Sequence, residues 1–113
     1  VIEVGNLSSY RDFIDVRDAA KAFWQLVQTP SAYGQIVNIC TGTPVLIQSA
    51  LDALLEISEV AVEICISPAL FRQGDVSCNY GSPTRLIRLT EFKPTYSFND
   101  TLQDIWNNLK FEA

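Results

Sequence analysis

The chain has 113 residues, the usual size of one domain, and we expect a single domain over residues 1–113. Its residues are 48% apolar and 19% charged, and no apolar run approaches the roughly 18 residues of a membrane span. This composition predicts a soluble globular protein and excludes a membrane protein. Eight Lys and Arg against thirteen Asp and Glu give a formal net charge of −5, which argues against nucleic acid as a partner. An anionic ligand would therefore have to be held by locally placed arginines.

The cysteine and histidine content limits the kinds of catalytic and metal site that the chain can form. The three cysteines, Cys40, Cys65 and Cys78, form no C-x-x-C pair, which predicts free thiols and a cytoplasmic location, with Cys40 and Cys65 as small core residues. The sequence contains no histidine, so Ser-His-Asp and Cys-His catalysis and the common zinc sites are excluded. No signal peptide is visible, and a start inside an apolar run reads as the middle of a longer protein.

Strand-like and helix-like segments alternate over the first part of the chain. Asp15 has the character of a helix N-cap, because apolar residues follow it at helical spacing. That helix should end before Pro30, since the residue before a proline is driven out of the helical region. The expected elements are strands at 1–5, 35–40 and 61–66, a brief extended piece at 12–14, and helices at 15–29 and 47–57.

The last part of the chain adds an irregular connection and two helices. The connection runs from Ser67 to Tyr80, after which Ser82 and Pro83 form a helix start for residues 84–89. Ser97 should cap the final helix. The element order predicts an α/β fold: a small, partly parallel sheet with about four helices. Three short strands leave edges and helix faces to be covered.

Four sequence blocks point to a known family. They are GNLSSYRDFIDVRDAAKAF at 5–23, VNICTG at 37–42, ALFRQGDV at 69–76 and LTEFKP at 89–94. In this order they resemble the C-terminal, substrate-binding part of extended short-chain dehydrogenase/reductases that act on nucleotide sugars. The similarity is strongest to the GDP-mannose 4,6-dehydratase and GDP-4-keto-6-deoxymannose reductase branch, and it covers nearly the whole chain. The resemblance implies the C-terminal portion of an extended short-chain dehydrogenase/reductase fold.

The resemblance also bears on cofactor and catalysis. In that family the N-terminal part carries a G-x-x-G-x-x-G turn for NAD(P) and a Tyr-x-x-x-Lys pair for the chemistry, and neither pattern occurs in these 113 residues. The resemblance therefore implies NAD(P) in complete family members, no cofactor for this chain, and no catalysis by this chain alone.

Three candidate site residues follow from the resemblance. It implies that Arg11 approaches the pyrophosphate of a nucleotide sugar, that Arg72 is a second phosphate arginine, and that Asp75 accepts ribose hydroxyls. The residue types suit these roles, because a guanidinium offers a planar fork of donors to phosphate and a carboxylate accepts two O–H groups. Gly74 would let the chain turn so that both side chains face one ligand.

Simpler interpretations of the same residues stay open. Arg11 could form a surface ion pair with Asp12 or Asp15, and the residues from Arg72 to Asp75 could be an ordinary polar turn. Asn6 lies where the family chain passes the nucleotide, but it is also a natural turn residue after the first strand, and we favour that interpretation.

Two functional hypotheses result. The first is a nucleotide-sugar-binding fragment, with a GDP-sugar as the favoured partner, of an NAD(P)-dependent dehydratase, epimerase or reductase. The second is a self-associating module, a homo-oligomer in which another copy covers the unpartnered strands and apolar helix faces.

Overall fold

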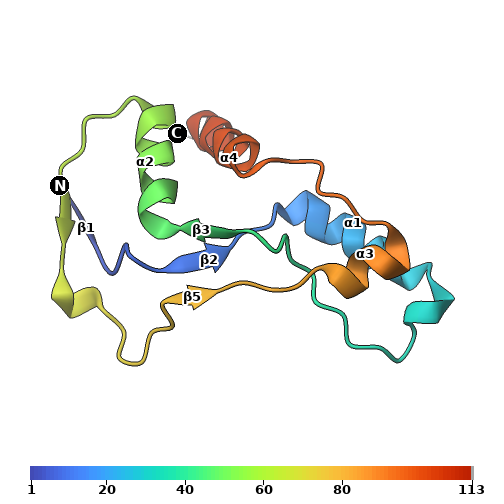
Figure 1. Ribbon diagram of the computed structural model, residues 1–113. Helices are drawn as coiled ribbons and strands as arrows, with labels where there is room; N and C mark the ends of the chain where they lie inside the picture. The colour runs from blue at the N-terminus through green and yellow to red at the C-terminus, as the bar shows by residue number, and fades with distance from the viewer. Residues whose placement is uncertain (113) are drawn as a thin grey trace.

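The computed structural model describes the backbone of residues 1–112 and the side chains of residues 1–109. The molecule is an elongated body with extents of 51 × 37 × 19 Å (Figure 1). Its elements in chain order are β1 (Ile2–Val4), β2 (Tyr10–Asp12), α1 (Val16–Val27), η1 (Pro30–Ala32), β3 (Pro44–Leu46), α2 (Ile47–Ser58), β4 (Ile64–Ile66), η2 (Pro68–Leu70), β5 (Cys78–Asn79), α3 (Thr84–Thr90) and α4 (Phe98–Glu112). The predicted α/β class, with parallel strands and four α-helices in the described part of the chain, is confirmed.

The strands form two small sheets. In one, β1 and β4 run parallel, with Ile2 opposite Ile64. In the other, β2 lies between β3, which is antiparallel to it, and β5, which is parallel. Arg11 therefore sits on the central strand, opposite Val45 on one side and Asn79 on the other. Because both neighbours fix the backbone of β2, the base of this side chain is held in place.

The hydrophobic core lies between α1 and α3. Ala22 of α1, Leu86 of α3 and Phe92 after α3 are its buried members. Partly buried residues pack around them: Ile14, Leu26, Val37 and Ile39. At the other end of the molecule α2 packs against α4 (Figure 1). Within residues 1–112 no helix is long and apolar enough to cross a bilayer.

The helix predictions hold, with small shifts. Asp15 caps α1, because its Oδ1 accepts a hydrogen bond of 2.8 Å from the backbone N–H of Arg17. Ser97 caps α4 in a reciprocal pair with Asp100, the two hydrogen bonds being 3.0 and 3.1 Å long. The third helix begins at Thr84 with Pro83 as its cap residue, one position later than the Ser82 cap predicted.

The strand predicted at 35–40 is wrong. The segment is an open connection with no neighbouring strand in the described part of the chain, and Ile36 is 86% exposed. An apolar alternation can form a strand only where a second strand satisfies its backbone groups. The alternating pattern is present at 35–40, but no strand in the described part of the chain pairs with this segment.

The other strands were partly predicted. The piece expected at 12–14 forms β2 two residues earlier, and only the last three residues of 61–66 form β4. β3 and β5 were not predicted, since each has only two or three residues and lies beside prolines or polar turns. Cys65 lies exposed on β4 and not in the core, whereas Cys40 is buried. All three cysteines are free thiols.

Helix α1 turns its most apolar side outward. Its inward side carries the buried residues Asp18 and Ala22. The outward side is a stripe one helical face wide, which we call the α1 stripe: Val16, Ala20, Phe23, Trp24 and Val27. Val16 is 78% exposed and Trp24 is 63% exposed. The helical periodicity of the sequence is therefore real, but these residues are not part of the core of this chain.

Candidate ligand-binding pocket

The three candidate site residues and Asn6 line one pocket. It has a volume of about 250 Å³ and lies where β2, the start of α2 and the turn after η2 meet. Its complete lining is Asn6, Ser9, Arg11, Ile47, Leu70, Arg72 and Asp75. The fold thus brings the two arginines, which are distant in the sequence, to the same cavity with Asp75 beside them.

Arg11 is paired across the pocket. Its Nη2 donates a hydrogen bond of 2.9 Å to Oδ1 of Asp75, and its Nη1 donates one of 2.7 Å to the carbonyl oxygen of Tyr10. The two side chains of the ion pair are 30% and 31% exposed. The simpler interpretation, an ion pair with Asp12 or Asp15, is wrong, because both of those carboxylates are bound elsewhere.

The turn from Arg72 to Asp75 places these two residues in the same pocket. The N–H of Asp75 donates to the carbonyl oxygen of Arg72 at 3.4 Å, and Gly74 has a φ of +74°, a left-handed conformation that suits glycine. The predicted turn at this glycine is confirmed. The guanidinium of Arg72 has no hydrogen bond or ion pair with any residue in the described part of the chain, and it is therefore available to a ligand.

Asn6 is a turn residue, as favoured, and it also lines the pocket. Its Oδ1 accepts hydrogen bonds from the N–H and the hydroxyl of Ser8, at 2.9 and 2.6 Å. Its Nδ2 donates to Oγ of Ser9 at 3.2 Å, and Ser9 Oγ is 3.5 Å from Oδ2 of Asp75. Ser9 is only 3% exposed. Sequence reasoning missed it, because a serine in a polar stretch carries no distinguishing signal.

Asp12 holds two loops next to the pocket. It accepts hydrogen bonds from the backbone N–H groups of Thr41, Gly42 and Gly81, at 3.0, 2.9 and 3.2 Å. Burial raises its pKa, but the hydrogen bonds from Thr41, Gly42 and Gly81 outweigh that effect, so the pKa lies below its ordinary value. Asp12 is therefore an ionised structural residue.

Asp15 ties the start of α1 to α4. Arg17 donates to both of its oxygens, at 2.9 and 2.8 Å, and the hydroxyl of Thr101 donates at 2.6 Å. The hydrogen bonds from Arg17 are the main reason that the pKa of Asp15 lies far below its ordinary value. Arg17 also reaches Asp104 on α4, at 2.8 Å, and its guanidinium lies 3.6 Å from the centre of the Tyr96 ring. The charged side chains of this network pair with one another, so none of them is available to a ligand.

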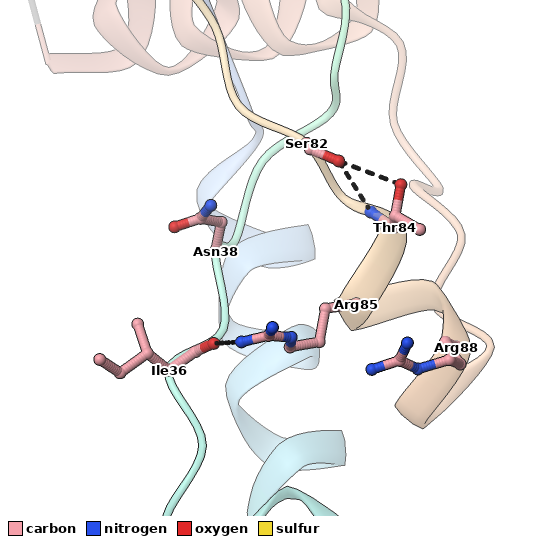
Figure 2. Close-up of a pocket in the computed structure, with 6 residues that line it drawn as sticks. All are labelled: Ile36, Asn38, Ser82, Thr84, Arg85 and Arg88. Carbon is pink, nitrogen blue, oxygen red and sulfur yellow. Dashed lines mark hydrogen bonds between the residues drawn. The ribbon is translucent and has the colours of Figure 1, made fainter.

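A second basic pocket lies beside α3. It measures about 390 Å³ and is lined by Ile36, Asn38, Ser82, Thr84, Arg85 and Arg88. Figure 2 shows both arginines on the same side of α3 as the 36–38 segment, with Nη1 of Arg85 donating to the carbonyl oxygen of Ile36 at 2.8 Å. Its lining contains no carboxylate. It could hold an anion, but it lacks the acceptor that suits the hydroxyls of a sugar.

A larger cavity, with a mostly apolar lining, lies apart from both basic pockets. It measures about 690 Å³ and lies between the start of α1, α2 and α4, with Leu54, Leu102 and Ile105 in its lining. Its lining has carboxylates but no arginine or lysine. A diphosphate would be repelled there, so the pocket of Arg11 and Arg72 is the better candidate for a phosphorylated ligand.

The described residues contain no glycine-rich dinucleotide turn and no cluster of metal-binding side chains. A dinucleotide needs a glycine turn between a strand and a helix, but here β3 passes into α2 through Leu46 with no side-chain cap, and α1 begins at the carboxylate of Asp15. A pyrophosphate would be repelled by that carboxylate. No group of three metal-binding side chains occurs in the described part of the chain.

The family follows from comparison with known proteins. The model of the GDP-mannose 4,6-dehydratase family matches residues 1–105. The chain belongs to this family. The resemblance to extended short-chain dehydrogenase/reductases is thereby confirmed. The family match does not assign roles to individual residues.

Three relatives illustrate the family match. GDP-6-deoxy-D-mannose reductase from Pseudomonas aeruginosa is 33% identical over 92% of this chain, and GDP-6-deoxy-D-talose 4-dehydrogenase from Aggregatibacter actinomycetemcomitans is 30% identical over 98%. The structure of RMD from Pseudomonas aeruginosa complexed with NADPH matches 99% of the chain with a TM-score of 0.90 and 28% identity. The chain covers 34% and 38% of the two curated relatives and 36% of the solved chain. It therefore spans about a third of the length of each.

Proposed function

We propose that the pocket between Arg11 and Arg72 binds a nucleotide sugar, with GDP-sugars the favoured class. The observation that carries this proposal is the convergence of two arginines and one carboxylate on a single cavity. The names of both curated relatives contain a GDP-linked deoxysugar, which supports guanosine over other bases. In this proposal the chain is the nucleotide-sugar-binding part of an NAD(P)-dependent dehydratase, epimerase or reductase.

Each side chain has a chemical role in the proposal. Arg11 and Arg72 neutralise the diphosphate, since a guanidinium can donate two parallel hydrogen bonds to phosphate oxygens. Asp75 accepts hydrogen bonds from ribose hydroxyls. Leu70 and Ile47 supply apolar surface at the edge of the pocket. Binding is expected without turnover, because the cofactor turn and the Tyr-x-x-x-Lys pair of the family do not occur in these residues.

Calorimetric titration of the chain with GDP-, UDP- and dTDP-sugars tests the proposal. We expect heat with at least one of them, and tightest binding with a GDP-sugar. Arg11→Ala and Arg72→Ala should each lose about 1.5–3 kcal/mol of binding free energy, the range for hydrogen bonds to charged groups. Arg88→Ala is the matched control, because it removes the same charge from the other basic pocket. Absence of heat with all three classes, or an equal loss in the Arg88 variant, would contradict the proposal.

Self-association is a second candidate, which the exposed surface favours. The accessible surface is 8021 Å², whereas a compact protein of 12.6 kDa exposes about 6,200 Å². The excess is of the size that each partner buries in a large permanent interface. The α1 stripe is the clearest place for such a contact. Two partners would suit it: a second copy of the chain, or additional residues of a polypeptide as long as the relatives.

A further inference from the structure

The second basic pocket, beside α3, is built from two stretches of the chain that lack acidic residues. The sequence contains thirteen Asp and Glu, but none between Asp18 and Asp52 or between Asp75 and Glu91. The 36–38 segment comes from the first stretch and α3 from the second, and they form the two walls of the pocket. Because the net charge of −5 repels anions at long range, only such a local excess of positive charge can attract one.

Both walls of this pocket are fixed to the hydrophobic core. The arginines of α3 flank Leu86, which is fully buried. On the opposite wall, Val37 and Ile39 pack against the same core. Ile36 and Asn38 are exposed and belong to the lining. The polar groups of the pocket are therefore carried by two anchored pieces of backbone.

Arg85 is held in place and keeps donors for a ligand. Its Nη1 donates to the carbonyl oxygen of Ile36 at 2.8 Å, which draws the guanidinium across the pocket (Figure 2). A guanidinium has five N–H groups. Most of those of Arg85 have no partner in the part of the chain that the structure describes.

Arg88 lies on the same face of α3 and is unpaired. Figure 2 shows it on the same side of the helix as Arg85, three positions earlier in the sequence. It has no hydrogen bond or ion pair with any described residue. Two like charges at this spacing repel each other. An anion bound by both guanidinium groups removes this repulsion and accepts charge-assisted hydrogen bonds from each.

Ser82 and Thr84 add a neutral donor to the same pocket. Their hydroxyl oxygens lie 3.0 Å apart and share a hydrogen bond (Figure 2). Each hydroxyl has one O–H group, so this bond uses one of the two hydrogens and leaves the other for a ligand. The side-chain amide of Asn38 also lines the pocket and has no partner among the described residues.

This set of donors suits a phosphate monoester better than other anions. At neutral pH a phosphate monoester carries a charge of about −1.5 to −2 on three acceptor oxygens, which matches two guanidinium groups. A carboxylate offers one charge on two oxygens. Each phosphorus of a nucleotide sugar is esterified twice and also carries one charge, so such a ligand matches this pocket less well.

We propose that the pocket beside α3 is a second binding site, which takes a phosphate monoester group. The group belongs either to a small molecule or to a phosphorylated side chain, because both present the same dianion. Arg85 and Arg88 neutralise it, and the free hydroxyl of the Ser82 and Thr84 pair donates to it. The site is separate from the pocket of Arg11 and Arg72 and does not depend on the proposed function.

Titration of the 113-residue chain with glycerol 2-phosphate tests the site. Backbone amide NMR signals of residues 82–88 should shift and saturate, while those of residues 72–75 report the other basic pocket separately. Arg88→Gln should weaken binding at 82–88 by about ten-fold, because it removes hydrogen bonds to a charged group. Arg88→Lys should recover part of this loss, since it restores the charge without the planar fork of donors. The spectra also show whether each variant is folded.

Lys21→Gln is the control for Arg88→Gln. Lys21 is an exposed cation in the first acid-free stretch and does not line the pocket, so its loss should change the affinity by less than about two-fold. An equal loss in both variants would mean that phosphate responds only to the general positive charge of this region. That result, or the absence of saturable shifts at 82–88, would overturn the proposal.

The dependence of binding on pH tests the requirement for a dianion. Arg85 and Arg88 are the titratable groups of the described lining, so the pocket keeps its charge between pH 5 and 7.5. The second pKa of a phosphate monoester is about 6, so its affinity should fall about ten-fold over this range as it gains a proton. Sulfate stays a dianion and should bind equally at both pH values. Equal phosphate binding at both would contradict a dianion site.

A phosphoserine peptide distinguishes the two sources of phosphate. Tighter binding of the peptide than of glycerol 2-phosphate, with added shifts at residues 36–39, identifies a phosphorylated segment that lies along the exposed 36–38 wall. Comparable affinities identify a small molecule as the ligand. The unphosphorylated peptide should not bind, and binding by it would contradict recognition of the phosphate.

Discussion

The stretch from Arg11 to Asp18 divides its charges between contacts that hold the fold together and the candidate pocket. Asp12 accepts hydrogen bonds from two loops, Asp15 caps α1, and Asp18 accepts the N–H groups of Thr95 and Tyr96 at 2.9 and 3.0 Å. These carboxylates satisfy backbone donors that would otherwise be buried without a partner. Because all three are occupied in this way, Arg11 turns to Asp75 and lies at the pocket.

The depressed pKa of Asp15 predicts an acid-sensitive fold. The folded carboxyl holds its proton less tightly than its ordinary pKa of 3.8, so the unfolded chain binds more protons in acid. The stability that Asp15 contributes is therefore complete above pH of about 4 and is lost progressively as the pH falls below it. Asp15→Asn should lower the free energy of unfolding at pH 7 by about 1.5–3 kcal/mol, since Asn still caps a helix but loses the charged bonds to Arg17.

Denaturant titrations between pH 2.5 and 7 check this prediction. The variant should lose less stability than the original chain as the pH falls. Asp52→Asn serves as the control, because Asp52 is exposed and receives a hydrogen bond only from Gln48 among the described residues. Parallel curves for the Asp15 variant and the original chain would rule out Asp15 as a source of acid sensitivity.

The sequence could predict individual site residues only where a motif named them. Arg11, Arg72 and Asp75 follow from the family blocks, and the fold places them in one pocket. The contact between Arg11 and Asp75 joins residues 64 positions apart, and no local pattern contains it. Ser9 was missed for the same reason, since its partner Asp75 is 66 positions away.

At the scale of elements, local signals identified helices better than strands. Asp15 and Ser97 mark the starts of α1 and α4, because capping is a contact within three residues. A strand depends on a neighbour that can come from anywhere in the chain. The segment at 35–40 has a strand-like sequence without a neighbour, and β5 has a neighbour with almost no strand-like sequence.

The backbone of Gly42 lies close to Pro83 at the start of α3. A larger residue at position 42 should therefore push the loop and the helix apart. Gly42 has a φ of +80°, and a Cβ there would lie 2.8 Å from Cδ of Pro83. Gly42→Ala should therefore lower the free energy of unfolding by more than the roughly 1 kcal/mol expected for an unfavourable φ alone. Gly34→Ala isolates that conformational part, since Gly34 has a φ of +77° with nothing near its Cβ position.

Thermal and denaturant unfolding of both glycine variants measure the difference. A larger loss for Gly42→Ala than for Gly34→Ala would report the contact with Pro83. Similar losses would indicate that the loop moves aside at little cost, and that α3 is not held by this approach.

At the scale of the whole molecule, the chain is too extended to be covered by its own residues. Its radius of gyration is 16.9 Å, whereas a compact domain of this length has about 13 Å. The α1 stripe accounts for part of the exposed apolar surface. Sequence periodicity could identify the stripe but not its direction, because the side that faces inward is decided by where α3 packs.

Trp24→Gln tests the role of the α1 stripe in self-association. Light scattering and sedimentation should show a dimer or larger assembly for the original chain, and the variant should associate at least about ten-fold more weakly, as for a central aromatic residue in an interface. Tyr80→Gln is the control, because Tyr80 is a comparably exposed aromatic residue outside the stripe. A strictly monomeric chain at high concentration would rule out the second copy as the partner.

The long dimension of the molecule separates the two regions for which we propose nucleotide-sugar binding and self-association. The turn after η2, which contributes Arg72 and Asp75 to the pocket, lies toward the end formed by β1, β4 and α2, while α1 and α3 form the opposite end (Figure 1). Under these two proposals, a partner seated on α1 would leave the entrance of the pocket open, so both sites would be able to be occupied at the same time.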